Sequence, residues 1–362
     1  MKKLGIIVGC RPNYVKAAAL VKEFERREKL PFAWYIGVTG QHHDDSMSYN
    51  FAKYFKIGQY IQTSFPYNDH GWICDDYTPA VQLSSLIYKA DKIIQPGTDA
   101  VMVLGDVDSS AAAALAARRM KISVYHYEAG LRCGDMNMVE EQNRVIIDTL
   151  ADEFFITEQS GYQNLFKEGK SPNNIHFVGD IMVDVLMEEL ARDIPRNDGK
   201  YGVLTLHRAE NVDDPDVFWR IIKTMGTLPI NFIYPVHPRV RNRYSFKGYA
   251  INLDQNNILT NYTMGYSEFI RLCRNAQIII TDSGGVQTEA MVMGVPCITL
   301  RDVTEKLCTI EAGGNYLAGN DPELIKNAFK LMVGKSNSYV LPRGHDGKAA
   351  KRTVDILEKL LA

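Results

Sequence analysis

The chain has 362 residues, a formal net charge of -2 and 23% charged residues, which predicts a globular protein of about two domains. It contains no run of lysine or arginine, which argues against nucleic acid or an anionic membrane as the main partner. No apolar stretch approaches the roughly 20 residues that a membrane-spanning helix needs. The six cysteines are scattered without CxxC pairs, which predicts reduced thiols in a cytoplasmic protein.

Short apolar runs alternate with helical patterns through the first half of the chain. The helical patterns include residues 15–28 and 109–121. Runs this apolar are typical of strands buried on both faces of a parallel sheet that helices cover. The predicted strands are residues 4–9, 34–40, 100–106, 122–128 and 152–157.

The same alternation restarts in the second half, after a charged stretch with Pro and Gly at residues 193–200 that we interpret as a linker. The sequence therefore predicts an α/β protein with two doubly wound, Rossmann-like domains facing a cleft. The predicted helices are residues 215–225, 267–276 and 322–333. The predicted strands are residues 201–207, 231–238, 277–282 and 295–300.

Charged side chains collect where the predicted strands of the first half end. In a parallel sheet these ends meet at one edge, where ligands bind in this class of fold. If charged residues followed only one strand, an ordinary solvated loop would explain them. Charged residues follow several strands here, which solvated loops alone do not explain. The residues concerned are Arg11, Lys16, Asp106, Glu128, Arg132, Glu140, Glu141 and Arg144.

Strands of the second half end in the same way. His207 and Arg208 follow one strand, and His237 and Arg239 follow the next. These histidines could be ordinary polar strand ends, but an adjoining arginine suits phosphate binding.

The segment TDSGGVQTEA (281–290) leads from a strand through Asp-Ser-Gly-Gly into a helix. Free N–H groups of the first helical turn and two glycines make room for an anion such as a diphosphate. Ser283 could equally be an ordinary N-cap, with glycines chosen for tight packing. The segment is neither a Walker A loop nor GxGxxG, and the chain has no HExxH or CxxC motif. ATP, NAD and a metal ion therefore have no specific support.

The carboxylates also allow two interpretations. Asp106 could cap the following helix, as could Asp108 or Ser109, and Glu140 lies in a first helical turn that favours negative charge. Glu128 is different, because it continues a strand and comes too early to cap a helix. A buried glutamate needs a partner or a raised pKa, which makes Glu128 a candidate for proton transfer.

These motifs, in this order, resemble the UDP-N-acetylglucosamine 2-epimerase family of the non-hydrolysing type. The resemblance spans nearly the whole chain, and EAGLR, HRAEN and DSGGVQ together are specific. The matching segments are GCRP (9–12), TGQH (39–42), LGD (104–106), HYEAGLR (126–132), EEQNR (140–144), TLHRAEN (205–211), HPR (237–239), TDSGGVQTEA (281–290), PCITLRD (296–302) and DGKAA (346–350).

The resemblance implies the GT-B fold, with a first domain at residues 1–170 and a UDP-binding domain at 171–345. The last helix, within 346–362, is expected to pack back on the first domain. The family interconverts UDP-N-acetylglucosamine and UDP-N-acetylmannosamine for polysaccharide biosynthesis, as a homodimer and without a cofactor.

Family members eliminate UDP to form 2-acetamidoglucal and then add it back, which requires carboxylates near both faces of the sugar ring. The resemblance assigns catalysis to Asp106, Glu128, Glu140 and His207. It assigns UDP binding to Arg11, Lys16, Arg132, Arg208, His237, Ser283, Gly284, Gly285, Glu289 and Arg301.

The chain also departs from the family pattern. Asn13 stands where an acid is usual, and Lys306 and Cys308 replace an arginine and an acid near the expected nucleotide site. These changes leave open a 2-epimerase of another UDP-2-acetamido sugar, such as a diacetamido uronic acid. The hydrolysing branch, a GT-B glycosyltransferase and a non-catalytic UDP-sugar sensor are further alternatives. Arg11-Pro12 favours the non-hydrolysing branch, and three acids count against a sensor.

Overall fold

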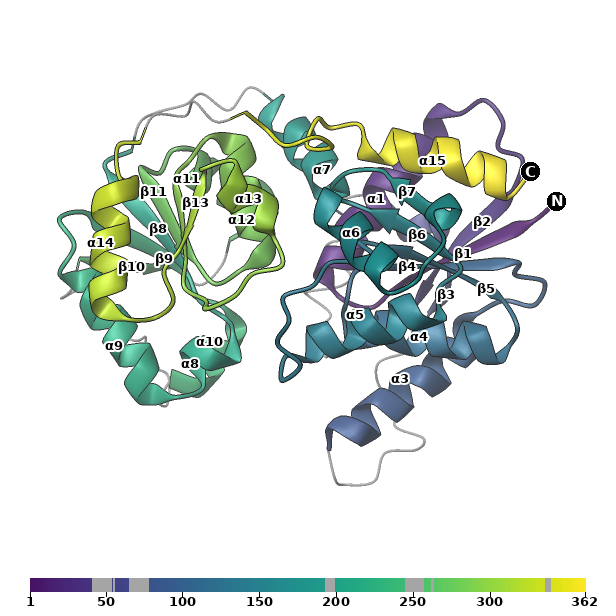
Figure 1. The fold of residues 1–362 in the computed structure, drawn as a ribbon, viewed down its shortest axis with the longest axis horizontal. Helices are drawn as coiled ribbons and strands as arrows, with labels where there is room; N and C mark the ends of the chain where they lie inside the picture. Colours follow the sequence, from purple (N-terminus) through teal and green to yellow (C-terminus); the bar gives the residue numbers. More distant parts are fainter. Residues whose placement is uncertain are drawn as a thin grey trace. The chain divides into compact units, whose positions relative to one another are not determined.

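The structure, a computed structural model, describes residues 1–40, 54, 56–64, 78–192, 199–244, 257–261, 264–335 and 340–362, apart from the side chains of Arg11 and Asn261. It divides into one unit of Met1–Val185 with Arg343–Ala362 and a second of Leu186–Pro342 (Figure 1). Most of the predicted linker and the end of TGQH lie outside the described residues.

The first unit is built on a parallel sheet in the order β3-β2-β1-β4-β5-β6-β7. β1 therefore lies centrally, between β2 and β4, and the strand order reverses there. The strands are β1 (Lys3–Val8), β2 (Ala33–Val38), β3 (Ile61–Ser64), β4 (Ala100–Leu104), β5 (Ser123–Tyr127), β6 (Glu153–Ile156) and β7 (Ile175–Phe177).

The second unit repeats the arrangement with a parallel sheet in the order β10-β9-β8-β11-β12-β13. Its strand order reverses between β8 and β11. Both sheets follow the doubly wound order, so the predicted fold class is confirmed. The strands are β8 (Tyr201–Thr205), β9 (Asn231–Pro235), β10 (Ile258–Asn261), β11 (Ile278–Thr281), β12 (Cys297–Thr299) and β13 (Asn315–Leu317).

Helices connect these parallel strands and cover both sheets (Figure 1). None within the described ranges is long and apolar enough to cross a membrane. The boundary between the two units falls inside α7. The helices are α1 (Arg11–Arg26), α3 (Pro79–Ile93), α4 (Asp108–Arg119), α5 (Val139–Leu150), α6 (Gln159–Lys167), α7 (Ile181–Leu190), α8 (Ala209–Val212), α9 (Pro215–Gly226), α10 (Pro238–Tyr244), α11 (Tyr266–Arg274), α12 (Gly284–Met293), α13 (Leu307–Glu311), α14 (Pro322–Met332) and α15 (Ala349–Leu360).

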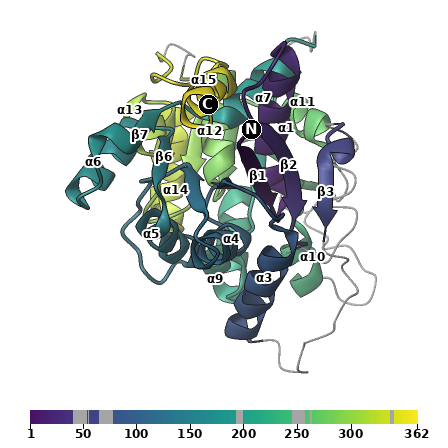
Figure 2. The same cartoon turned by 90° about the vertical axis from the view of Figure 1, so that its right-hand side faces the viewer.

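One face of the first sheet is covered by α3, α4 and α5. Buried alanines of α4 pack with Ile93 of α3, Ile147 of α5 and the sheet residues Val101 and Val103. Small side chains let α4 lie close to both the sheet and α3, and the two helices run side by side in Figure 2. This close approach fixes the start of α4, and with it the loop after β4.

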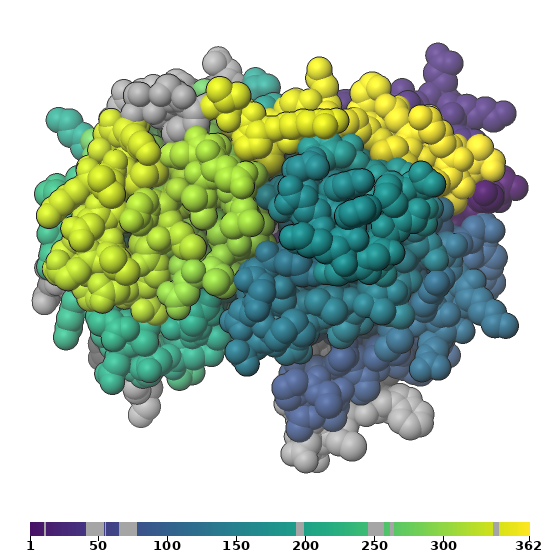
Figure 3. Space-filling view, in the orientation of Figure 1, coloured from purple at the N-terminus to yellow at the C-terminus, as the bar shows by residue number. Residues whose placement is uncertain are grey.

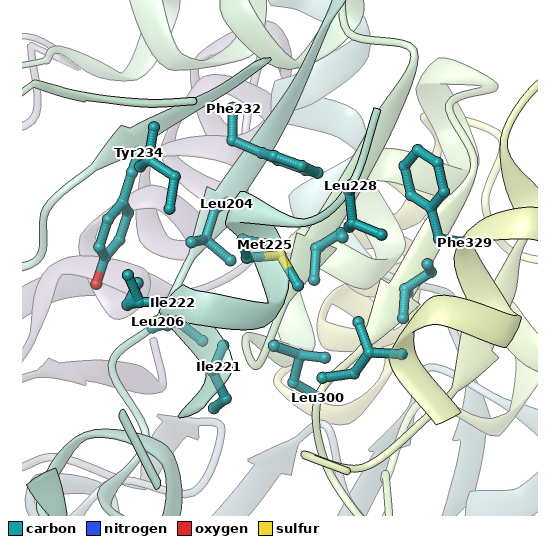
Figure 4. Close-up of a cluster of buried hydrophobic side chains, with 14 of the residues drawn as sticks. Leu204, Leu206, Ile221, Ile222, Met225, Leu228, Phe232, Tyr234, Leu300 and Phe329 are labelled. Atoms are coloured by element: carbon teal, nitrogen blue, oxygen red, sulfur yellow. The ribbon is translucent and has the colours of Figure 1, made fainter. Parts of the chain in front are cut away.

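The second sheet has its own apolar core between its strands and the helices α9 and α14 (Figure 4). Phe232 and Leu204 of the strands meet Ile221 and Met225 of α9 and Phe329 of α14, all almost fully buried. Because each unit has a core of its own, each can hold the ends of its strands rigidly.

The C-terminal helix α15 packs against α1 of the first unit and lies on its surface (Figure 3). The carboxylate of Asp184 accepts hydrogen bonds from the Ala349 and Ala350 amides at 3.0 and 2.7 Å, which caps the helix. Burial raises the pKa of Asp184 to about 6. At the C-terminal end of α1, Arg27 pairs with Asp355 of α15 at 2.7 Å.

Leu357 of α15 is fully buried, whereas Lys359 is exposed. We predict that Leu357→Ala lowers the free energy of unfolding of the first unit by about 2–5 kcal/mol, because it removes buried methyl groups and leaves a cavity. Urea unfolding measures this, with Lys359→Ala as the control. Equal stabilities of the two variants would show that α15 contributes nothing to the unit.

Candidate active site

The predicted acids of the first unit follow β4 and β5, next to the point where the strand order reverses. Asp106 follows β4, Glu128 follows β5, and Glu140 lies half-buried in the first turn of α5. The charges of Asp106, Glu128 and Lys16 all act on the thiol of Cys10, which follows β1. Burial, the largest cause, raises the pKa of that thiol to about 12. Three separate segments therefore place these charges around one edge of the sheet.

Glu128 is held in a backbone conformation that side chains rarely adopt, with φ of +73°. Such strain persists only where the surroundings enforce it, and it concentrates at functional sites. Its carboxylate pairs with the ammonium of Lys16 in α1, and only 13% and 8% of the two side chains are exposed. A β-carbon on Gly105 would lie 2.8 Å from the Glu128 carboxylate and 2.9 Å from the Lys16 nitrogen, so the pair needs glycine there.

Arg144 of α5 is a buried cation that holds two carboxylates. Its Nη2 lies 2.6 Å from Asp106 and its Nη1 lies 2.7 Å from Glu141, and only 2% of its side chain is exposed. Removing one partner of such a buried pair typically costs about 3–5 kcal/mol. The Asp106 side chain is 28% exposed, so it pairs with buried Arg144 and can still contact a ligand.

Glu141 is turned inward, unlike its neighbour Glu140. It accepts hydrogen bonds from the amides of Cys133 and Gly134, at 2.9 to 3.1 Å. Burial raises the pKa of Glu141, but these amides and Arg144 outweigh it and hold the pKa below its usual value. Glu141 therefore fixes the loop between Glu128 and α5.

Asn13, which replaces the usual acid of the family, is 1% exposed and holds the loop after β1. Its Oδ1 accepts from the amides of Gly9 and Cys10, and its Nδ2 donates to the carbonyl of Leu104 at 2.6 Å. A carboxylate could not donate that third bond. The substitution therefore suits the local structure.

Arg132 is held between two carboxylates that the sequence does not assign to the site. It pairs with Asp148 of α5 at 2.7 Å and with Glu168 at 2.8 Å. Its predicted role in UDP binding stays a prediction, as does that of Arg11.

In the second unit, Asp282 is buried directly after β11, and its carboxylate accepts several hydrogen bonds. Its carboxylate accepts from the His207 and Arg208 amides at about 3 Å, and it lies 2.9 Å from His207 Nδ1. Burial raises its pKa, but the charge and hydrogen bonds of His207 and the Arg208 amide keep the pKa below its usual value. Because the carboxylate accepts from Nδ1–H, the ring offers Nε2 to a ligand. The His207 side chain is 30% exposed.

The other predicted cations of this unit lie in different surroundings. The His237 ring lies 5.3 Å from the His207 ring, centre to centre. Arg301 is buried and pairs with Glu305 at 2.8 Å. Arg208 begins α8 as its N-cap residue. The structure thus brings His237 next to His207 and places Arg301 beside an acid.

The start of α12 follows β11, and the amides of a first helical turn have no partner within the helix. Ser283 occupies the N-cap position of α12, but its side chain makes no capping hydrogen bond to the described helix. Gly284 is covered by Glu305, since a β-carbon would lie 2.3 Å from that carboxylate, whereas Gly285 is exposed and open. One turn later, Glu289 is buried and accepts from the Tyr266 hydroxyl at 3.1 Å.

Sequence reasoning did not single out Asp148 or Gln287 as parts of the site. In α12, Gln287 Oε1 accepts hydrogen bonds from the Thr304 hydroxyl at 2.9 Å and from Asn315 Nδ2 at 3.1 Å. Asp148 was detectable, because Glu141, Arg144 and Asp148 recur at helical spacing on the inward face of α5. A charged stripe on the buried face of a helix indicates a site rather than a core.

Comparisons with known proteins agree with this geometry. The family described as UDP-N-acetylglucosamine 2-epimerase matches residues 22–358. The UDP-N-acetylglucosamine 2-epimerase of Methanocaldococcus jannaschii is 35% identical over 375 residues, covering 98% of each chain. A crystal structure of the enzyme from that organism, in complex with UDP-GlcNAc and UDP, has a TM-score of 0.86 at 33% identity, covering 99% of each chain. The predicted resemblance is confirmed.

Two further relatives bear on specificity and fold. The UDP-2,3-diacetamido-2,3-dideoxy-D-glucuronate 2-epimerase of Pseudomonas aeruginosa is 32% identical over 368 residues, covering 99% of this chain and 100% of the relative. A calicheamicin glycosyltransferase has a TM-score of 0.55 at 13% identity, over 99% of this chain and 98% of that one, which is a likeness of fold alone.

The lowered pKa of Asp282 predicts how the second unit responds to acid. A carboxyl whose pKa is lower in the folded state stabilises the protein above its unfolded pKa, near 3.8, and this contribution is lost as the pH falls through the lower, folded value. We expect Asp282→Asn to cost about 1–3 kcal/mol at pH 7, through weakened hydrogen bonds to buried groups. We also expect it to flatten the fall in stability below pH 4. Urea unfolding from pH 2 to 7 measures both effects, and equal slopes for variant and wild type would contradict the assignment.

Proposed function

This chain belongs to the UDP-N-acetylglucosamine 2-epimerase family, and on that premise we propose that it interconverts UDP-N-acetylglucosamine and UDP-N-acetylmannosamine. The observation that carries the proposal is the strained, lysine-paired Glu128 beside the arginine-held Asp106 in the first unit. A protein that only binds UDP-sugars has no need to gather these acids at the ends of β4 and β5.

The chemistry of carbon 2 explains why several acids are needed. Its proton is not next to a carbonyl, so direct removal would leave an unstabilised carbanion. Loss of the proton together with departure of UDP from carbon 1 avoids this and leaves 2-acetamidoglucal. Return of a proton to the opposite face, with UDP adding back, gives the epimer. We assign the proton transfers to Asp106, Glu128 and Glu140.

The second unit supplies donors for the departing diphosphate. His207, whose Nδ1 is fixed by Asp282, can as an imidazolium donate from Nε2 to a phosphate oxygen. The amide groups at the start of α12, at Gly284 and Gly285, favour a negative charge. Glu289, next to Tyr266, is the proposed acceptor for the ribose hydroxyls. Fixed donors of this kind stabilise the charge that develops as the bond to carbon 1 breaks.

A second candidate substrate is a UDP-2,3-diacetamido uronic acid. The observation that favours it is the 32% identity to the Pseudomonas aeruginosa enzyme named for that sugar, close to the 35% found for a UDP-N-acetylglucosamine 2-epimerase. The reaction at carbon 2 would be the same, and only the groups on carbons 3 and 5 would differ.

The family resemblance also supports a proposal for the oligomeric state and the cellular compartment of the protein. We infer a homodimer acting in the cytoplasm, in the synthesis of precursors for polysaccharides. The free thiols of Cys10, Cys133, Cys273, Cys297 and Cys308 support a reducing compartment.

The function is tested by incubating the purified protein with UDP-N-acetylglucosamine and separating the products by anion-exchange chromatography. We expect an equilibrium mixture with UDP-N-acetylmannosamine, together with traces of UDP and 2-acetamidoglucal. Accumulation of free N-acetylmannosamine and UDP would assign the chain to the hydrolysing branch instead. Turnover of only the diacetamido uronic acid would establish the second candidate.

Glu128→Gln is predicted to lower kcat by at least about 100-fold, because positioned acid–base groups typically contribute about 10²–10⁴-fold. The variant should still bind UDP with a Kd near that of the wild type, since the introduced glutamine can still accept a hydrogen bond from Lys16 and since His207, Gly284 and Gly285 lie in the second unit. Calorimetry with UDP and the product assay measure the two properties. Asp91→Asn, which changes an exposed carboxylate of α3, is the control. Full activity of Glu128→Gln would remove Glu128 from the mechanism.

A further inference from the structure

His126 and Asp148 form a buried hydrogen-bonded pair at the base of the loops that carry Asp106 and Glu128. His126 is the fourth residue of β5 and Asp148 lies on the inward face of α5. His126 Nδ1 lies 2.6 Å from Asp148 Oδ1, and at most 1% of either side chain is exposed. Neither residue can reach solvent, so the pair acts on the protein around it.

The His126 ring has a partner on each side. Its Nε2 lies 3.2 Å from the carbonyl oxygen of Gly105, while Nδ1 faces the carboxylate of Asp148. Asp148 also pairs with Arg132 at 2.7 Å. Burial raises the pKa of Asp148, but the charges and hydrogen bonds of His126 and Arg132 hold it below its usual value.

The pair is bonded to the backbone of both acid-bearing loops. On one side, the Gly105 carbonyl that accepts from His126 directly precedes Asp106. On the other, Asp148 Oδ2 accepts from the Gly130 amide at 3.0 Å, two residues after Glu128. One buried pair therefore spans the loop after β4 and the loop after β5.

Both loops hold conformations that need such support. The φ angles are +74° at Gly105, +73° at Glu128 and +76° at Gly130. For the glutamate this conformation costs free energy, so the bonds on either side must enforce it. Further bonds on this turn run from the Glu128 and Ala129 amides to the Phe155 carbonyl, at 3.0 and 3.3 Å, and from Asn164 Nδ2 to the Gly130 carbonyl at 2.9 Å.

We propose that His126 and Asp148 are positioning residues of the epimerisation, which fix Glu128 and Asp106 relative to each other through the backbone of their loops. The inference rests on the proposed function for its effect on turnover. A buried hydrogen-bonded pair is not needed for stability, because apolar residues of similar volume are often as stabilising. A small displacement of reacting groups, by contrast, can cost about 100-fold in rate.

The test is Asp148→Asn, which keeps the shape of the side chain but removes its charge. We expect kcat to fall by about 30-fold or more, while KM and the Kd for UDP change by less than about threefold. The proposed diphosphate donors His207, Gly284 and Gly285 lie in the second unit, and Arg132 keeps its ion pair with Glu168. Hydrogen exchange of the peptide spanning residues 128–134, followed by mass spectrometry, should become at least about tenfold faster as the Gly130 amide loses a charged acceptor. This readout does not depend on activity.

His176→Gln is the matched control. His176 of β7 pairs with Glu153 of β6 at 2.7 Å and its ring packs on Phe155. The variant therefore loses a histidine–carboxylate pair of the same sheet without removing the hydrogen bonds that hold the Gly105 and Gly130 backbone. It should leave both kcat and the exchange of residues 128–134 unchanged. If Asp148→Asn does not fold, His126→Gln is measured in the same way.

Wild-type exchange and wild-type kcat in a folded Asp148→Asn protein would overturn the inference. So would equal losses in Asp148→Asn and His176→Gln, which would indicate general destabilisation. The two proposals can fail separately. If the wild type turns over no UDP-sugar but hydrogen exchange is faster in Asp148→Asn, the proposed function is contradicted. The positioning of the Glu128 turn by Asp148 is then still supported.

Discussion

The site of the first unit depends on buried cations that balance carboxylates at one edge of a parallel sheet. Lys16 pairs with Glu128, Arg144 bridges Asp106 and Glu141, and Arg132 pairs with Asp148. Removing a charge from water is costly, and an uncompensated carboxylate here would destabilise the fold or lose its charge. The cations come from α1, from α5 and from the loop after β5, so the packing of these elements is coupled to the charges of the acids.

The doubly wound topology gives each sheet an open edge, and the proposed acids lie at one edge while the proposed phosphate donors lie at the other. In each sheet the strand order reverses beside the first strand, between β1 and β4 or between β8 and β11. The chain leaves these strands in opposite directions, which leaves an open edge where side chains can face a ligand. The first edge carries Asp106 and the second carries His207 and the start of α12. The division suits a reaction in which carbon 2 exchanges protons while UDP stays bound.

Much of this could be read from the sequence, because long apolar runs specify the central strands and because parallel strands bring their ends to one edge. The strands β3, β7, β10 and β13 were not predicted. They are the edge strands of the two sheets, and each is short and contains polar residues, so the sequence pattern did not separate them from loops. The alternatives for Glu128 were a partner or a raised pKa, and the structure supplies a partner, Lys16. Those residues are 112 positions apart, so sequence spacing could not pair them. Asp106 is likewise held by Arg144 and does not occupy the N-cap position of α4, which belongs to Val107.

The central claim is that carbon 2 of a UDP-sugar loses its proton to this protein and regains one from it. Proton NMR of the purified wild type with UDP-N-acetylglucosamine in deuterated water tests the claim directly. The account predicts that UDP-N-acetylmannosamine appears with deuterium at carbon 2, because solvent exchanges with the carboxyl groups between the two proton transfers. UDP-N-acetylmannosamine that retained its original hydrogen at carbon 2 throughout the reaction would contradict this mechanism. No change in the spectra of either UDP-N-acetylglucosamine or the diacetamido uronic acid derivative would contradict the function itself.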